Sequence, residues 1–380
     1  MIPTINSNHL IRIAAGILAA AALLLPASAQ ASTAANTQIA NTATVSYQDA
    51  GGVAQTPVTA SVTVTVTLVP AAVTISSPAN QTISQGQSAT LTYTVTGNAN
   101  GPDTYNLSST ATPTNISAVT VTVPANVVLG GTTLAANAVA GNTSITVPYD
   151  GVGGATVNGI GAGSVIVIGG NPYTVAAGGV SKNAPANTAT ITLTTAIAGA
   201  TVNAGAIVGE QKTFTATVPS GTVSSGSSGS QSVSTTATSA TAPNPAATQT
   251  TPTVITVNRP TLTVQKLVST DGGATFGASG SAAPGTSLVY KIIATNTGAT
   301  NAQAVAFTDV VPQYLAYVNG SGKSATSAAT SYAAATALTE GAGGYTYTAG
   351  TQTVAYDPGG ATGTVAGGGT LILFFRATIN

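Results

Sequence analysis

Strict alternation of apolar and polar residues is the feature that most constrains this chain. In "PVTASVTVTVTL", residues 57–68, Val, Ala and Leu alternate with Thr and Ser after the first proline. Successive side chains of a strand point to opposite faces, so this spacing places the apolar residues on one face of a half-buried antiparallel strand. The segments "LTYTVT" (91–96) and "LVYKII" (288–293) behave similarly, and helical periodicity is nowhere convincing.

Turn-forming residues separate these strands along the whole chain. Gly, Asn, Asp and Pro cluster between the alternating segments, and Thr and Val, which favour strands, are abundant. Regular strands divided by such turns are typical of a β-sandwich. We therefore predict an all-β protein, and its length indicates two or three domains.

The N-terminal segment, residues 1–31, has the pattern of a secretory signal peptide. Arg12 precedes the apolar run Ile13–Leu25, and Pro26 is followed by small residues with cleavage positions after Ala29 or Ala31. The alternative is an uncleaved membrane anchor, for which the run is short. We expect an exported chain, either free in the extracellular medium or at the cell surface.

Charge and cysteine content exclude several kinds of partner. Removing the signal peptide also removes Arg12 and His9, which leaves seven basic and eight acidic residues. So few scattered cations form no basic patch for nucleic acid or an anionic membrane. A net charge near zero gives little electrostatic protection against self-association. The absence of cysteine excludes disulfides, thiolate metal sites and cysteine nucleophiles.

Catalytic chemistry has few residues to use in the exported chain. Without histidine or cysteine, the eight dispersed acids leave few general bases or nucleophile activators. A Ser-Lys or paired-carboxylate site stays open as an alternative, although no spacing indicates one. We expect no enzyme, no cofactor, no metal and no small-molecule substrate.

Two long segments of the chain resemble each other. Residues 84–107 and 282–307 each have a Gly-containing turn, then Leu-x-Tyr-x-Val or Ile, then another turn and strand. This repeat predicts a first sandwich over 71–257 and a second sandwich over 259–380. Further strands at about 130–210 predict a small β-module inserted in the first sandwich.

The second segment resembles a known family of bacterial surface-protein repeats, domain of unknown function eleven. The matching residues are Pro284-Gly285, Tyr290, Asn296-x-Gly298, Asp309, Pro312 and Tyr317-Val318. The first sandwich is a looser match, with Gly86, Tyr93 and Asp103 but without an equivalent of "TDVVP". The resemblance implies tandem immunoglobulin-like β-sandwiches in an extracellular protein, and it implies no catalytic residues.

A second repeat concerns two predicted hairpins. Residues 37–66 and 230–257 each contain a Thr-Ala-Thr strand, a turn-rich gap, Thr-Pro and an alternating Val/Thr strand. We interpret each as the closing hairpin of a sandwich. The hairpin at 230–257 follows the first sandwich, whereas the second sandwich ends on "LILFFRATIN" (371–380) where its own hairpin should begin. The N-terminal hairpin arm, residues 32–68, stands at the opposite end.

This order leads to a hypothesis of head-to-tail assembly. The N-terminal hairpin of one subunit would complete the second sandwich of the next by β-strand addition, giving an extracellular filament whose partner is a second copy of the chain. An exposed donor arm would also require a dedicated chaperone or outer-membrane assembly factor. The predicted donor face comprises Ile39, Ala43, Val45, Tyr47, Val58, Val62, Val64 and Val66. The predicted acceptor groove comprises Leu371, Leu373, Phe375, Ala377 and Ile379.

The alternative keeps the protein monomeric. The hairpin would then fold back onto its own chain, and the protein would be a secreted or surface-associated adhesin or a surface-layer component. The linker "LVPAA" (68–72) is too short to carry the hairpin past the first sandwich unless the two sandwiches lie side by side.

Three polar residues carry smaller expectations. In "STDGGATF" (269–276) we expect Asp271 to pin a hairpin turn, the alternative being a sialidase-type box of a β-propeller. Asp309 is expected to accept backbone N–H bonds in a turn, with calcium binding as the alternative. Lys266 is expected to be solvated or paired, with an isopeptide bond to Asn380 as the alternative.

Overall fold

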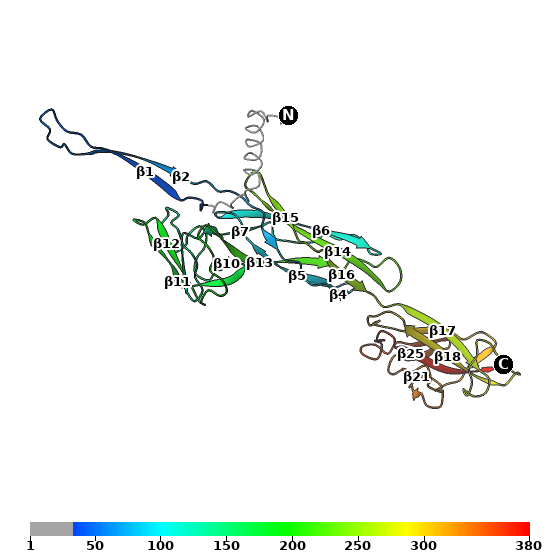
Figure 1. The fold of residues 1–380 in the computed structure, drawn as a ribbon. Coiled ribbons are helices and arrows are strands. Elements are labelled where there is room, and N and C mark those ends of the chain that lie inside the picture. Colours follow the sequence, from blue (N-terminus) through cyan, green and yellow to red (C-terminus); the bar gives the residue numbers. More distant parts are fainter. Residues whose placement is uncertain (1–32) are drawn as a thin grey trace, which may run out of the picture.

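The computed structural model describes residues 33–380, and the predicted signal peptide lies outside the described residues. Over this range the chain is all-β, with 25 strands arranged in five sheets. No helix in the described part is long and apolar enough to cross a membrane. Figure 1 shows an extended molecule with three parts in line: an N-terminal hairpin, a first sandwich carrying an inserted module, and a second sandwich.

The N-terminal hairpin, here called the arm, is a two-stranded sheet of its own. It is formed by β1 (Gln38–Val45) and β2 (Val58–Thr65), which pair antiparallel. Figure 1 shows it projecting beyond the first sandwich, on the side opposite the second sandwich.

The first sandwich consists of two packed layers. One layer has the strand order β3-β5-β13, with β3 (Thr74–Ile75), β5 (Ser88–Thr96) and β13 (Ile207–Pro219). The other has the order β4-β16-β14-β6-β7, with β15 beside β14. Its strands are β4 (Gln81–Ser84), β6 (Asp103–Thr114), β7 (Asn126–Leu129), β14 (Ser228–Ser239), β15 (Ala246–Thr248) and β16 (Thr253–Asn258). Inward residues of both layers, among them Leu91, Tyr93 and Ile255, form one core.

The inserted module has its own core. Its strands are β8 (Gly131–Thr133), β9 (Ser144–Pro148), β10 (Val165–Ile168), β11 (Asn171–Asn183) and β12 (Thr188–Leu193). Ile166, Ile191 and Val208 are fully buried in its centre. The long strand β13 joins the module to the sandwich, because its first residues pair with β8 and β10 and its later residues pair with β5.

The second sandwich also has two layers. One has the order β17-β18-β25-β21-β22, with β20 also beside β25. Its strands are β17 (Leu262–Ser269), β18 (Ser287–Asn296), β20 (Leu315–Tyr317), β21 (Lys323–Ala325), β22 (Thr336–Ala337) and β25 (Thr370–Ile379). The other layer has the order β19-β24-β23, with β19 (Phe307–Val310), β23 (Tyr345–Thr348) and β24 (Thr353–Tyr356).

A stacked aromatic pair occurs at corresponding positions in the two sandwiches. Tyr93 on β5 lies directly opposite Phe214 on β13, and their rings stack with centroids 5.1 Å apart. Tyr290 on β18 lies opposite Phe375 on β25 in the same manner, at 5.2 Å. Strand β5 is therefore equivalent to β18 and β13 to β25, and the strands β3 and β17 that pair beside them are equivalent too.

Candidate assembly interface

The strand register of the arm separates its side chains into an apolar and a polar face. Ile39 pairs with Val64, Asn41 with Val62, and Val45 with Val58, and these side chains share one face. Ala43 and Ala60 belong to it as well. The opposite face carries Gln38, Ala40, Thr42, Thr44, Thr59, Ser61, Thr63 and Thr65. We call the first the apolar face of the arm.

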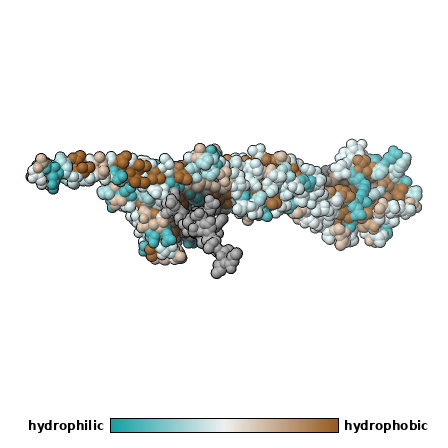
Figure 2. All heavy atoms as spheres, turned by 45° about the horizontal axis from the view of Figure 1, so that its top comes forward, coloured by the Kyte–Doolittle hydropathy of each residue, from teal (hydrophilic) through white to brown (hydrophobic). Residues whose placement is uncertain are grey.

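The apolar face of the arm is uncovered. Every residue of β1 and β2 is exposed, and Figure 2 shows hydrophobic patches along this part of the molecule. The large side chains and their exposed fractions are Ile39 51%, Val45 62%, Tyr47 52%, Val58 59%, Val62 61% and Val64 59%. Val66, the last residue of the predicted donor face, lies at the root of the arm and is half-buried. An isolated hairpin with an open apolar face is marginal in water, so this surface is suited to a partner.

The tip of the arm is closed by an acidic side chain. Asp49 Oδ1 accepts hydrogen bonds from the N–H groups of Gly51 and Val53, and Asp49 Oδ2 accepts one from Gln55 Nε2. Gly52 has φ 79°, a conformation that glycine adopts without strain. The tip is therefore a defined turn that keeps β1 and β2 in register.

The root of the arm is fastened to the first sandwich. The buried side chain of Asn100 donates to Thr33 O and accepts from Val69 N–H, so it holds the chain before and after the arm. Ala35 packs on Gly101, where a Cβ would lie 2.5 Å from the Ala35 Cβ. Because both ends of the arm are fixed here, its position relative to the first sandwich is determined at the root.

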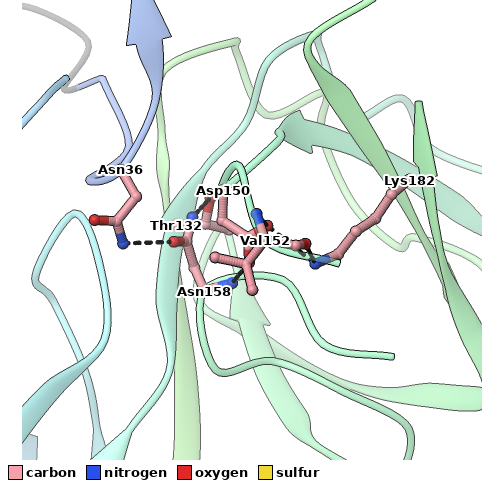
Figure 3. A network of polar contacts seen from close by, with 6 residues as sticks. All are labelled: Asn36, Thr132, Asp150, Val152, Asn158 and Lys182. Carbon is pink, nitrogen blue, oxygen red and sulfur yellow. Dashed lines mark hydrogen bonds and ion pairs between the residues drawn. The ribbon is translucent and has the colours of Figure 1, made fainter. Parts of the chain in front are cut away.

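A polar network connects the root to the inserted module (Figure 3). Asn36 Nδ2 donates to Asn158 Oδ1 at 3.5 Å, and Asn158 Nδ2 donates to Thr132 Oγ1 at 3.3 Å. Asp150 accepts from the backbone N–H of Asn158 and forms an ion pair with Lys182 at 3.0 Å. The module thus supports the base of the arm through side chains that are themselves held by a buried ion pair.

Electrostatics keeps Asp150 ionised in this network. Burial alone would raise the pKa of its carboxyl group. The N–H groups of Asn158 and Val152, together with the hydrogen bond and charge of Lys182, outweigh burial and hold the pKa below 3.8. The carboxylate is therefore charged at neutral pH.

The closing hairpin of the first sandwich has the same residue pattern as the arm, but it is packed within a sandwich. Strand β14 lies between β16 and β6, and β16 pairs in parallel with β4. The inward residues Val233, Ala237 and Ile255 are fully buried against the opposite layer. The predicted closing hairpin at 230–257 thus lies inside the first sandwich.

The corresponding place in the second sandwich holds no strand of the described chain. Strand β19 pairs with β24 on one edge, where Val311 N–H donates to Gln352 O. Backbone groups alternate along a strand, so those of Thr308 and Val310 point to the other edge. Residues 33–380 supply no strand there, whereas the equivalent edge of β6 is paired with β14.

The layer opposite this free edge of β19 is more exposed than the equivalent layer of the first sandwich. Val264 on β17 is 69% exposed, whereas its equivalent Val73 in the first sandwich is 5% exposed. A hollow of about 390 Å³ is lined by residues 280–282, Leu288, Tyr290 and Ile379, among others. Residues 280–283 precede the Gly285 turn as β4 precedes the Gly86 turn. In the first sandwich β16 and β14 lie between β4 and β6, and we call the equivalent position between residues 280–283 and β19 the open slot.

The predicted acceptor groove along the last strand is wrong for four of its five residues. Leu371, Leu373, Phe375 and Ala377 are at most 2% exposed, because β19, β24 and β23 cover their face. Strand β25 is also no edge, since β18 pairs on one side and β20 and β21 on the other. Ile379 is half-buried and lines the hollow beside residues 280–282.

Two of the smaller expectations are confirmed and one is wrong. Asp271 accepts hydrogen bonds from the N–H groups of Ala274 and Thr275 and from the Thr275 hydroxyl, so it pins the turn as expected. Lys266 is paired, with its Nζ 2.6 Å from Asp309 Oδ2. Asp309 therefore lies in β19 as an ion-pair partner and is not a turn residue.

No cluster of metal-binding side chains occurs in the part of the chain that the structure describes. Within it, no three His, Cys, Asp or Glu side chains gather closely enough to hold an ion. The acidic residues that are buried there, such as Glu210 and Asp150, bond to backbone N–H groups and lysines.

Comparisons with known proteins identify no family for this chain. No family model matches it, and no curated protein matches it. The C-terminal domain of the Streptococcus agalactiae AgI/II polypeptide BspA superposes with a TM-score of 0.32 and 12% identity, over 82% of this chain and 91% of that one. The C-terminal domain of the Streptococcus pyogenes antigen I/II-family protein AspA gives 0.33 and 11%, over 90% and 91%. A putative membrane-anchored protein of Corynebacterium diphtheriae gives 0.21 and 10%, over 90% and 88%. Superpositions this loose do not inform the function of this chain.

Proposed function

We propose that this protein is an exported structural subunit of an extracellular filament. In this filament, the arm of one copy occupies the open slot of the second sandwich of the next copy. The proposal includes export by the N-terminal segment and membership of the second sandwich in the surface-repeat family that it resembles. It assigns the chain no catalytic role.

One observation carries the proposal: within residues 33–380, the arm packs in no sandwich and the second sandwich has no strands at the position that the closing hairpin fills in the first. The arm exposes Val62 at 61%, and the second sandwich exposes Val264 at 69%. The first sandwich supports this pairing, because its own closing hairpin buries the equivalent residues. Each fully buried Val- or Ile-sized side chain contributes about 1.5–3 kcal/mol, so the arm's apolar face offers a substantial driving force.

The positions of the two surfaces favour a filament over a closed pair. The arm and the second sandwich lie at opposite ends of the described molecule (Figure 1). A contact between two different surfaces of the same subunit is heterologous, and its repetition extends in one direction unless the rotation closes a ring. Strand addition supplies backbone hydrogen bonds, and the alternating side chains supply the fit.

The test compares two chains that begin at residue 32. In one, residues 38–65 are replaced by Asn-Gly, a turn that preserves the root because Thr37 O already accepts from Val66 N–H at 2.9 Å. We expect filaments of the intact chain in negative-stain electron microscopy and monomers of the shortened chain. The melting temperature of the monomeric state should change little, because every removed strand residue is exposed and the hydrogen bond lost with them, from Asn187 Nδ2 to Gln38 O, is exposed too.

Matched point variants refine this experiment. Val62→Asp places a charge on the apolar face of the arm and should abolish filaments, whereas Thr63→Asp places it on the polar face and should leave them. Monodisperse particles of the intact chain would contradict the proposal. That result would favour the monomeric secreted adhesin or surface-layer component, with the arm folded back onto its own chain.

A further inference from the structure

A polar cluster lies inside the first sandwich where its closing hairpin meets β6. Thr235 on β14 lies directly opposite Ser109 on β6, and the two hydroxyls are hydrogen-bonded at 2.7 Å. Burial raises the pKa of the nearby Tyr93 hydroxyl, and the hydroxyls of Thr235 and Thr253 pull it in the opposite direction. The hairpin and the sandwich thus share a matched polar contact within an apolar core.

The second sandwich has charged residues at the same place. Asp309 faces inward two residues after the core residue Phe307, as Ser109 does after Leu107. The strand registers make Lys266 the equivalent of the buried Ile75. Lys266 Nζ lies 2.6 Å from Asp309 Oδ2 and 5.0 Å from the centre of the Tyr290 ring. An ion pair therefore spans the two layers at the open slot.

This ion pair is partly hydrated while the slot is open. The Lys266 side chain is 44% exposed and that of Asp309 is 12% exposed. A strand placed beside β19 would remove water from both groups. Buried charges are tolerated when their remaining hydrogen-bonding capacity is met, and they are costly when it is not.

The arm carries one polar side chain on its apolar face within β1. Asn41 shares that face with Ile39, Ala43 and Val45. The Thr-Ala-Thr repeat aligns Ala43 with Ala237, so Asn41 corresponds to Thr235. The residue that meets β6 in the first sandwich thus has a polar counterpart in the arm.

We propose that Asn41 of one copy contacts the Lys266–Asp309 pair of the next copy and fixes the register of the inserted arm. This inference rests on the proposed function. The amide of asparagine has N–H groups that donate to Asp309 and an oxygen that accepts from Lys266. One side chain can therefore meet the remaining hydrogen-bonding capacity of both charged groups. A shift by two residues brings Ile39 or Ala43 to the pair and leaves both charges buried without new partners.

An intermolecular disulfide tests the predicted register, because the chain has no cysteine of its own. Residues opposite each other in antiparallel strands have Cα atoms about 4.5–5.5 Å apart, within the range of about 4.4–6.8 Å that a disulfide accepts. The full chain carrying Thr42→Cys and Thr308→Cys, the neighbouring opposite pair, keeps Asn41, Lys266 and Asp309 and should form a ladder of linked subunits on non-reducing gels. The control pair, Ala40→Cys with Thr308→Cys, is displaced by two residues, about 6.8 Å along the strand, and should form much less.

A second measurement separates the positioning role of Asn41 from simple proximity. Asn41→Val should raise the subunit concentration needed for assembly by about tenfold or more, because it leaves the remaining hydrogen-bonding capacity of the buried ion pair unmet. Replacing the pair by the first sandwich's residues, Lys266→Ile with Asp309→Ser, should restore assembly of Asn41→Val.

The outcomes distinguish this inference from the proposed function. If the intact chain assembles but the control cysteines link better, the register is overturned. If Asn41→Val assembles at the same concentration as the intact chain, the positioning role is overturned. If the intact chain forms no filaments, the proposed function itself fails.

Discussion

The two hairpins of this molecule have the same residue pattern and opposite environments. In the closing hairpin, Val233 and Ile255 are fully buried within the first sandwich. In the arm, Ile39 and Val62 are 51% and 61% exposed. The pattern therefore decides which face of a hairpin is apolar, but it does not decide which sandwich buries that face.

Chain order explains the difference. The closing hairpin follows β13 and the loop after Pro219 in the chain, so it packs onto the layers that precede it. The arm precedes all other described strands, and Asn100 and Asn158 hold its root against the first sandwich and the module. Anchored there, the arm points away from the second sandwich (Figure 1).

The largest expected contrast follows from charging each hairpin at its apolar face. Val233→Asp buries a carboxylate at a fully buried position and should unfold the first sandwich, at a cost of several kcal/mol. Val62→Asp should leave the unfolding temperature of the monomer unchanged. Circular dichroism melts of both variants check this, and loss of structure in Val62→Asp would break the comparison.

A smaller contrast concerns the layers that the hairpins cover. Val73→Ser should lower the free energy of unfolding by about 1.5–3 kcal/mol, because Val73 packs beneath the closing hairpin. Val264→Ser, its equivalent in the open slot, should change the stability of the monomer by less than about 0.5 kcal/mol. Equal losses in denaturant titrations would show that the slot is already filled in the monomer.

The smallest effect is a pH dependence at the root of the arm. Because hydrogen bonds and Lys182 hold the pKa of Asp150 below its ordinary value of 3.8, its contribution to stability is fully present above about pH 4 and decreases as the pH falls through the folded-state pKa. Asp150→Asn should be less stable by about 1–2 kcal/mol at pH 7, and the difference should narrow at acid pH. A difference that is independent of pH would contradict this assignment.

Sequence patterns predicted the parts of the fold that local physics determines. Alternation located β2, β5 and β18, and the short turn around Asp271 followed from its side-chain chemistry. The apolar face of the arm was also readable, since the register unites Ile39, Val58 and Val64 on one side.

The acceptor site was not predictable in the same way. Leu373 and Phe375 suggested an open groove, but the strands β19, β23 and β24 that cover them have only four residues each, too few for alternation to identify them. The pairing of Lys266 with Asp309 joins residues 43 positions apart, and no local signal indicates such a contact. The open slot arises from pairing between distant strands, because β6 pairs with β14 whereas β19 pairs only with β24 among the described strands.

The most direct measurement is a cryo-electron microscopy reconstruction of filaments formed by the chain from residue 32 onward. We expect two added strands between residues 280–283 and β19 of each subunit. These strands should be residues 38–65 of the neighbouring copy, with Asn41 opposite Asp309. An empty slot, or a slot filled by strands of the same chain, would contradict this expectation.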